Sequence, residues 1–154
     1  MKKIAVSIPL VLALTLPFVA SAHEHATYQI GNNNYQIVIG SLNEPVAVDD
    51  KTGVDLTVTK CFTAACAATR SADGEMDGPA GTPVTGLEAT LKVEIAAGDQ
   101  KRMLDISPVW GKSGSYSAPF YPTVATTLTY RVNGTIDNVP VDLTITIVVP
   151  VAGE

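Results

Sequence analysis

The residues best suited to chemistry stand together as His23-Glu24-His25, and the chain contains no other histidine. If His23 is the first residue after processing, a free α-amine, two imidazoles and several backbone amides fall within three residues. The amine, two amide nitrogens and the imidazole of the third residue can then surround one ion in a square plane. Square-planar nitrogen ligation favours Cu(II) and, after it, Ni(II).

A second arrangement of the same residues also makes a metal site. The amine and imidazole of His23 can chelate one ion together, with His25 or the carboxylate of Glu24 completing the set. Against metal binding, residues beside a signal-peptide cleavage site are often polar, frayed and solvated. The triplet therefore predicts metal ligation by His23, His25 and Glu24, with a solvated terminus as the alternative.

Cys61 and Cys66 are the only cysteines, and four residues separate them. In an exported chain such a pair favours a local disulfide that closes a hairpin or loop. The alternative is a metal-binding or redox thiol pair, but the spacing matches neither redox motifs nor common zinc sites. We therefore expect a structural disulfide.

Catalytic motifs are not found in the sequence. Both histidines lie close to the start of the chain, so no Ser/His/Asp set can be drawn from the strands expected below. There is no G-x-S-x-G motif and no phosphate-binding glycine loop. The sequence predicts a protein that is not an enzyme.

The first 22 residues have the pattern of a secretory signal peptide. Lys2 and Lys3 precede an apolar run from Ile4 to Ala20, and Ala20-Ser21-Ala22 is a small-x-small cleavage site. An uncleaved membrane anchor is the alternative, disfavoured by two prolines in the run and by the cleavage site directly after it. We expect a mature domain of residues 23–154, periplasmic or secreted, with no membrane span after cleavage.

Composition narrows the class of this domain. Without the two leader lysines, 8 of the 10 basic residues remain against 15 acidic ones, a formal charge of −7 with neutral histidines. An acidic domain argues against nucleic acid or an anionic membrane as partner. Its richness in Val, Thr and Ile, with many Gly and Pro, indicates one all-β domain.

Strand periodicity is clearest between Gly114 and Val149, where apolar and polar residues alternate over three segments. A period of two places alternate side chains on opposite faces of a strand. The expected buried residues are Tyr116, Ala118 and Phe120, then Leu128, Tyr130 and Val132, then Leu143, Ile145, Ile147 and Val149. Pro119–Pro122 and Gly134–Pro140 are expected to turn the chain between these strands.

The rest of the domain gives further expectations. Alternation predicts that one strand carries Leu87, Ala89, Leu91, Val93 and Ile95 on a single face. Ala72–Pro83, rich in Gly, Asp and Pro, is expected to be an exposed loop, and Trp110 is expected to fill the core. Seven to nine short strands with turns about every ten residues indicate a Greek-key β-sandwich, immunoglobulin-like in the broad sense.

Several motifs together carry a family resemblance. They are His23-x-His25 before a Tyr-rich strand, Ile39-Gly40 with Asn43-Glu44-Pro45, Gly53–Thr59, Pro83–Val93, Gly114–Thr123 and Tyr130–Asp142. This pattern resembles a family of small secreted proteins of bacteria and archaea, largely of unknown function. In architecture it is similar to the CopC-type and YtkA-like periplasmic domains, small sandwiches associated with copper handling.

The resemblance implies that His23 binds Cu(II) through its amine and imidazole. CopC-type sites also use a histidine from the body of the sandwich, which this chain lacks, so His25 would have to replace it. The first hypothesis is therefore a copper carrier or buffer.

The second hypothesis is a module that docks an envelope or surface protein, through Ala72–Pro83 or the aromatic residues Trp110, Phe120 and Tyr121. A structural subunit of a surface assembly is the third.

Overall fold

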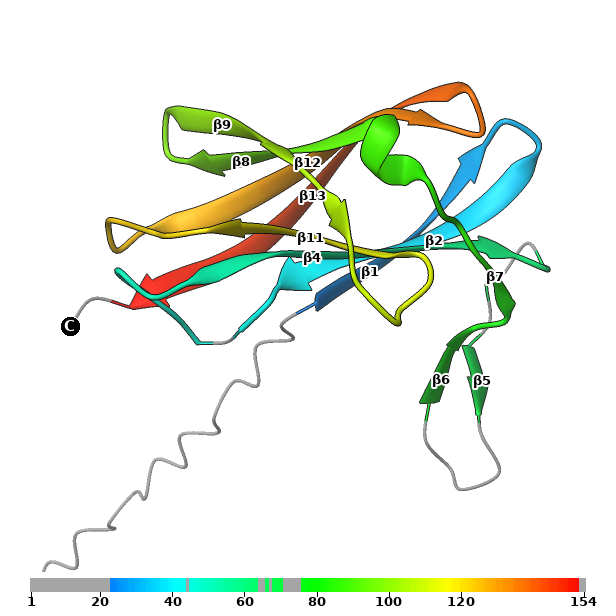
Figure 1. Cartoon of the computed structure of the whole chain (residues 1–154), viewed down its shortest axis with the longest axis horizontal. Coiled ribbons are helices and arrows are strands. Elements are labelled where there is room, and N and C mark those ends of the chain that lie inside the picture. The colour runs from blue at the N-terminus through cyan, green and yellow to red at the C-terminus, as the bar shows by residue number, and fades with distance from the viewer. Residues whose placement is uncertain (1–22, 44, 64–65, 67, 71–75, 153–154) are drawn as a thin grey trace, which may run out of the picture.

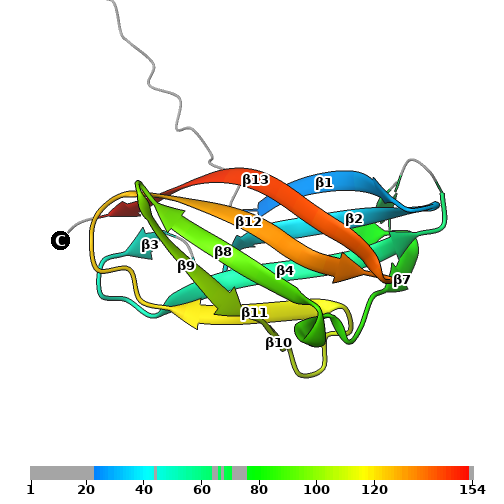
Figure 2. The same ribbon diagram turned by 90° about the horizontal axis from the view of Figure 1, so that it is seen from above.

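The computed structural model describes residues 23–43, 45–63, 66, 68–70 and 76–152, and the expected leader, residues 1–22, lies outside this part. The described chain forms two β-sheets that lie face to face, with a small separate hairpin at one end (Figures 1 and 2). The expectation of an all-β, sandwich-like domain is confirmed.

The first sheet is antiparallel throughout and has β1 at one edge. In spatial order its strands are β1 (His23–Ile30), β2 (Asn33–Ser41), β4 (Thr52–Cys61), β11 (Ser115–Phe120) and β10 (Ser107–Pro108), with β7 (Gly81–Pro83) paired to the end of β4.

The second sheet has β9 at one edge, and only its β3–β13 pair is parallel. Its order is β3 (Val46–Ala47), β13 (Val139–Ala152), β12 (Thr127–Ile136), β8 (Leu91–Ala97) and β9 (Gln100–Asp105). The separate hairpin consists of β5 (Ala68–Arg70) and β6 (Met76–Pro79).

The core lies between the sheets and follows the period of two, because alternate residues of each strand face inward. The first sheet contributes Tyr35, Ile37, Ile39, Val54, Leu56, Val58, Tyr116, Ala118 and Phe120, and the second contributes Leu91, Val93, Ile95, Leu128, Tyr130, Val132 and Ile145. Leu143 packs against this core while half-buried, and the side chains of Ile147 and Val149 lie outside the described part. The inward faces predicted for β11 and β12 are confirmed.

Three expectations about local structure need correction. The run from Leu87 is not one strand: Leu87–Ala89 form a 3-10 turn (η1), and β8 begins at Leu91. Residues 76–79 and 81–83 of the expected loop form β6 and β7, while residues 72–75 lie outside the described part. Trp110 is 98% exposed on the turn between β10 and β11, so it does not fill the core.

The turn between β12 and β13 is tighter than expected. Only Asp137 and Asn138 separate the strands, and both have positive φ, as a two-residue hairpin turn of type I′ requires. Gly134 instead lies inside β12, where a Cβ atom would stand 2.0 Å from the Thr90 carbonyl oxygen. Glycine is needed there for the close approach of two backbones.

Tyr116 joins the two sheets where the chain crosses between them. Residues 84–90 lead from β7 in the first sheet to β8 in the second. The buried Tyr116 hydroxyl donates to the Val84 carbonyl at 2.7 Å and accepts from the Leu87 amide at 3.2 Å. One side chain therefore satisfies two backbone groups of the crossing segment.

Tyr35 makes a comparable link at the β12–β13 turn. Its hydroxyl donates to the Asp137 carboxylate, which also accepts from Lys60 at 2.9 Å. The hydrogen bond from Tyr35, and then that from Lys60, lower the pKa of Asp137 below its usual value. The ionised carboxylate is the form that both donors stabilise.

We expect Tyr116→Phe to destabilise the protein by about 1–3 kcal/mol, because a buried amide and a carbonyl lose their partner. Urea unfolding monitored by circular dichroism measures this change. Tyr121→Phe is the matched control, since Tyr121 is 61% exposed, and its midpoint should not move. Equal unfolding midpoints for Tyr116→Phe and the wild type would contradict this role of the hydroxyl.

The Asp137 interaction predicts a pH dependence. Because the folded-state pKa lies below the unfolded one, the stabilisation is present above the ordinary Asp pKa and is lost as pH falls through the folded value. Asp137→Asn should therefore melt at a lower temperature near pH 7, and the two melting curves should converge in acid. The exposed Asp99→Asn is the control. A gap in melting temperature that persists unchanged into acid would refute the linkage.

Candidate functional site

All three residues of the predicted metal site lie on β1, the edge strand of the first sheet. The strand register aligns His23 with Gly40 of β2, and Gly40 with Asp55 of β4. Because Gly40 has no side chain, the imidazole of His23 reaches across β2 to the second neighbouring strand. Its Nε2 atom lies 3.3 Å from Oδ2 of Asp55.

The His23–Asp55 pair is accessible to solvent. The two side chains are 34% and 36% exposed, on the outer face of the first sheet. Exposed ion pairs contribute little to stability, typically about 0–1 kcal/mol. The small stabilisation expected from this pair therefore does not explain why a histidine and a carboxylate meet at this place.

The strand conformation separates the predicted ligands. Successive side chains of a strand point to opposite faces, so His23 and His25 share one face of β1 and Glu24 lies on the other. Glu24 is aligned with Ile39, whose side chain is in the core. The structure therefore brings His25 near His23 along the strand but does not bring Glu24 to the same face.

The same strand geometry bears on the square-planar arrangement. From His23 to Ile30, β1 is paired with β2 residue by residue. Consecutive backbone amides of a strand point in opposite directions. The amide nitrogens of Glu24 and His25 therefore cannot face one ion together while this pairing persists, whereas chelation by the amine and imidazole of His23 needs no amide nitrogen.

Within the described residues, no three His, Cys, Asp or Glu side chains are grouped closely enough to hold a metal ion. Among these described residues, His23 and Asp55 supply two neighbouring groups, and a further donor beside them would be of another kind. An α-amine, created by cleavage before His23, would be such a donor at this position.

The disulfide expectation is confirmed. Cys61 ends β4 and is bonded to Cys66, which is buried. Beside it, the Phe62 amide donates to the carbonyl of Ala80 and ties this loop to the segment before β7. Because the two sulfur atoms are bonded to each other, they do not bind a metal ion as thiolates in this state.

Two members of the site, Gly40 and Asp55, were not singled out as site residues from the sequence. The alternation of β4 predicts that Asp55 faces outward, and Gly40 follows a strand with clear alternation. The contact between His23 and Asp55 across Gly40 depends on the register of β1, β2 and β4, and His23 and Asp55 are 32 residues apart in the sequence. No local sequence pattern predicts that register.

The aromatic residues expected to form an interaction cluster do not lie together. Phe120 is buried at the end of β11, and the following Tyr121 is exposed. Trp110 precedes the other end of the same strand. The length of β11 therefore separates Trp110 from Tyr121.

Comparisons with protein-family models, with curated proteins and with solved structures find no match for this chain. In the part of the chain that the structure describes, no helix has the length and apolar character needed to cross a membrane.

Proposed function

We propose that this protein is exported, is cleaved between Ala22 and His23, and binds one Cu(II) ion at the new amino terminus as a carrier or buffer. The observation that carries the proposal is the approach of His23 to Asp55 across Gly40. Residues 1–22 would be the signal peptide, and the remaining domain an immunoglobulin-like Greek-key sandwich.

The donors follow from the geometry of an amino-terminal histidine. The α-amine and Nδ1 of His23 would chelate the ion, because both can face the same side of the residue. Nε2, the atom that lies 3.3 Å from Asp55, would then donate its hydrogen to the carboxylate. Metal-bound histidines commonly donate their other ring N–H to a carboxylate in this way.

Asp55 would act as a positioning residue. A carboxylate that accepts from the far side of the ring fixes the ring orientation and increases its basicity. His25, on the same face of β1, would supply a further imidazole. Glu24 lies on the other face of β1 and binds no metal in this proposal.

A carrier fits this site better than an enzyme does. The site has few protein donors, lies on the outer face of a sheet and is about one-third exposed. An ion held in this way can be exchanged with a partner without opening the core. The disulfide between Cys61 and Cys66 supports an oxidising compartment, where such bonds persist.

Copper titration of the processed protein tests the chelate. Four glycines added before His23 should raise the Kd for Cu(II) at least about tenfold, because they place the amine too far from the His23 imidazole for both to bind one ion, whereas a single glycine would leave an amine, an amide nitrogen and the imidazole able to chelate together. His25→Ala should weaken binding less. Asp55→Ala should raise the Kd about 10–100-fold by removing the carboxylate that orients the ring, and Asp99→Ala is the control with the same charge change.

Two results would overturn the copper proposal. One is unchanged affinity in both the extended protein and His25→Ala. The other is amino-terminal sequencing of the exported protein that finds His23 blocked or removed. A larger loss for His25→Ala than for Asp55→Ala would instead indicate the square-planar arrangement, with β1 detached at its start.

A second candidate function, docking to an envelope or surface protein, is favoured by Trp110. A tryptophan that is 98% exposed on a turn offers a large apolar contact to a partner. Trp110→Ala should then lose a binding partner in pull-downs from envelope extracts, whereas Tyr121→Ala, a change to another exposed aromatic, should retain it. Equal capture by both variants would exclude Trp110 as the anchor.

A further inference from the structure

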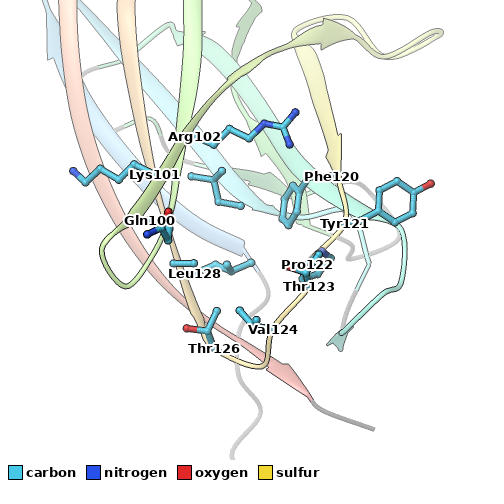
Figure 3. Close-up of a pocket in the computed structure, with 12 residues that line it drawn as sticks. Gln100, Lys101, Arg102, Phe120, Tyr121, Pro122, Thr123, Val124, Thr126 and Leu128 are labelled. Atoms are coloured by element: carbon cyan, nitrogen blue, oxygen red, sulfur yellow. The ribbon is translucent and has the colours of Figure 1, made fainter.

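A cleft of about 260 Å³ opens between the two sheets at the end of the sandwich where the β8–β9 turn faces the β11–β12 connection (Figure 3). Its inner wall is apolar and consists of buried side chains. They are Ile95 from β8, Phe120 from β11 and Leu128 from β12. The exposed Val124 lines it on the solvent side, so the cleft joins the core to the surface.

Arg102 gives this apolar cleft a positive charge. On β9, Arg102 is aligned with Ile95, and Leu104 with Val93, so the Arg102 side chain lies on the inward face of the strand. In Figure 3 it extends toward the side where Phe120 lies. Among the described residues Arg102 forms no ion pair.

The neighbouring Lys101 has a different role. It lies on the outward face of β9, points away from the cleft in Figure 3, and forms an ion pair with Glu94 at 3.3 Å. The residues that line the cleft include no Asp or Glu, although acidic residues outnumber basic ones in the chain by 15 to 10. The cleft is therefore a locally cationic site in an acidic protein.

We propose that this cleft binds a small organic anion with a flat apolar body, such as an aromatic carboxylate or sulfonate. The apolar body would contact Phe120, Leu128 and Ile95, and the anionic group would accept hydrogen bonds from the guanidinium of Arg102. Such charge-assisted bonds are stronger than neutral ones and can be bidentate with arginine. Apolar walls with a few placed polar groups are the usual form of small-molecule sites.

Protection of a sheet edge is the competing explanation for Arg102. An inward-pointing charge on an edge strand discourages pairing with another chain. That role requires only a charge and predicts no preference among small ligands. The anion site requires both the charge and the apolar wall, so the two explanations differ in what they predict for charged and neutral probes.

The test uses 8-anilinonaphthalene-1-sulfonate and its uncharged relative N-phenyl-1-naphthylamine, both followed by fluorescence with the folded protein. The sulfonate should bind more tightly than the neutral probe. Arg102→Gln should raise the sulfonate Kd about tenfold or more and leave the neutral probe unaffected. Arg131→Gln removes the same charge on β12, away from the cleft, and should change the Kd of neither probe.

A second variant tests the location. Thr126→Trp should fill the cleft from its rim and weaken the binding of both probes. In the wild type, the amide NMR shifts caused by the sulfonate should concentrate at Gln100, Thr123 and Thr126. Equal sulfonate affinity in Arg102→Gln and wild type would overturn the proposal, as would shifts centred on Trp110. Self-association of Arg102→Gln without loss of sulfonate binding would establish edge protection instead.

Discussion

The hydroxyl of Tyr116 is the contact on which the arrangement of the two sheets most depends. It holds the crossing segment at Val84 and Leu87, while its ring lies in the core between the sheets. The backbone of β11 is at the same time paired with β4. Fixing the crossing segment therefore fixes where the second sheet begins relative to β4, the strand that carries Asp55.

Two other inward tyrosines make polar links of the same kind. Tyr130 in the second sheet meets the hydroxyl of Ser41 in the first at 3.0 Å, and Tyr35 in the first sheet donates to Asp137 at the turn of the second. Buried hydroxyls are costly without partners. Each pair therefore favours one alignment of the sheets over others that would bury the same apolar area, a specificity that hydrophobic burial alone does not supply.

The sequence predicts the parts of this fold that local pattern controls. Alternation identified the inward faces of β11 and β12, because burial of one face imposes a period of two. The same signal failed at Leu87–Ala89. The 3-10 turn η1 has apolar residues two positions apart, which over only three residues cannot be told from strand alternation. The expectation for Trp110 came from the usual burial of aromatic residues in small β cores. It was wrong, since apolar character does not indicate which side of a turn faces solvent. Asp55 could be placed on an outward face but not beside His23, because that contact depends on the pairing of strands distant in sequence.

Both proposed sites lie at free edges of the sandwich, and packing explains why. At the centres of β2, β4, β8 and β12, the inward side chains are almost completely buried, which leaves no room for a ligand there. At an edge, a side chain on either face still reaches solvent. The outward His23 on β1 can therefore meet Asp55 while exposed, and the inward Arg102 on β9 can lie over apolar walls without being enclosed. A charged or metal-binding group on the inward face of a central strand would incur the desolvation penalty that these edge positions avoid.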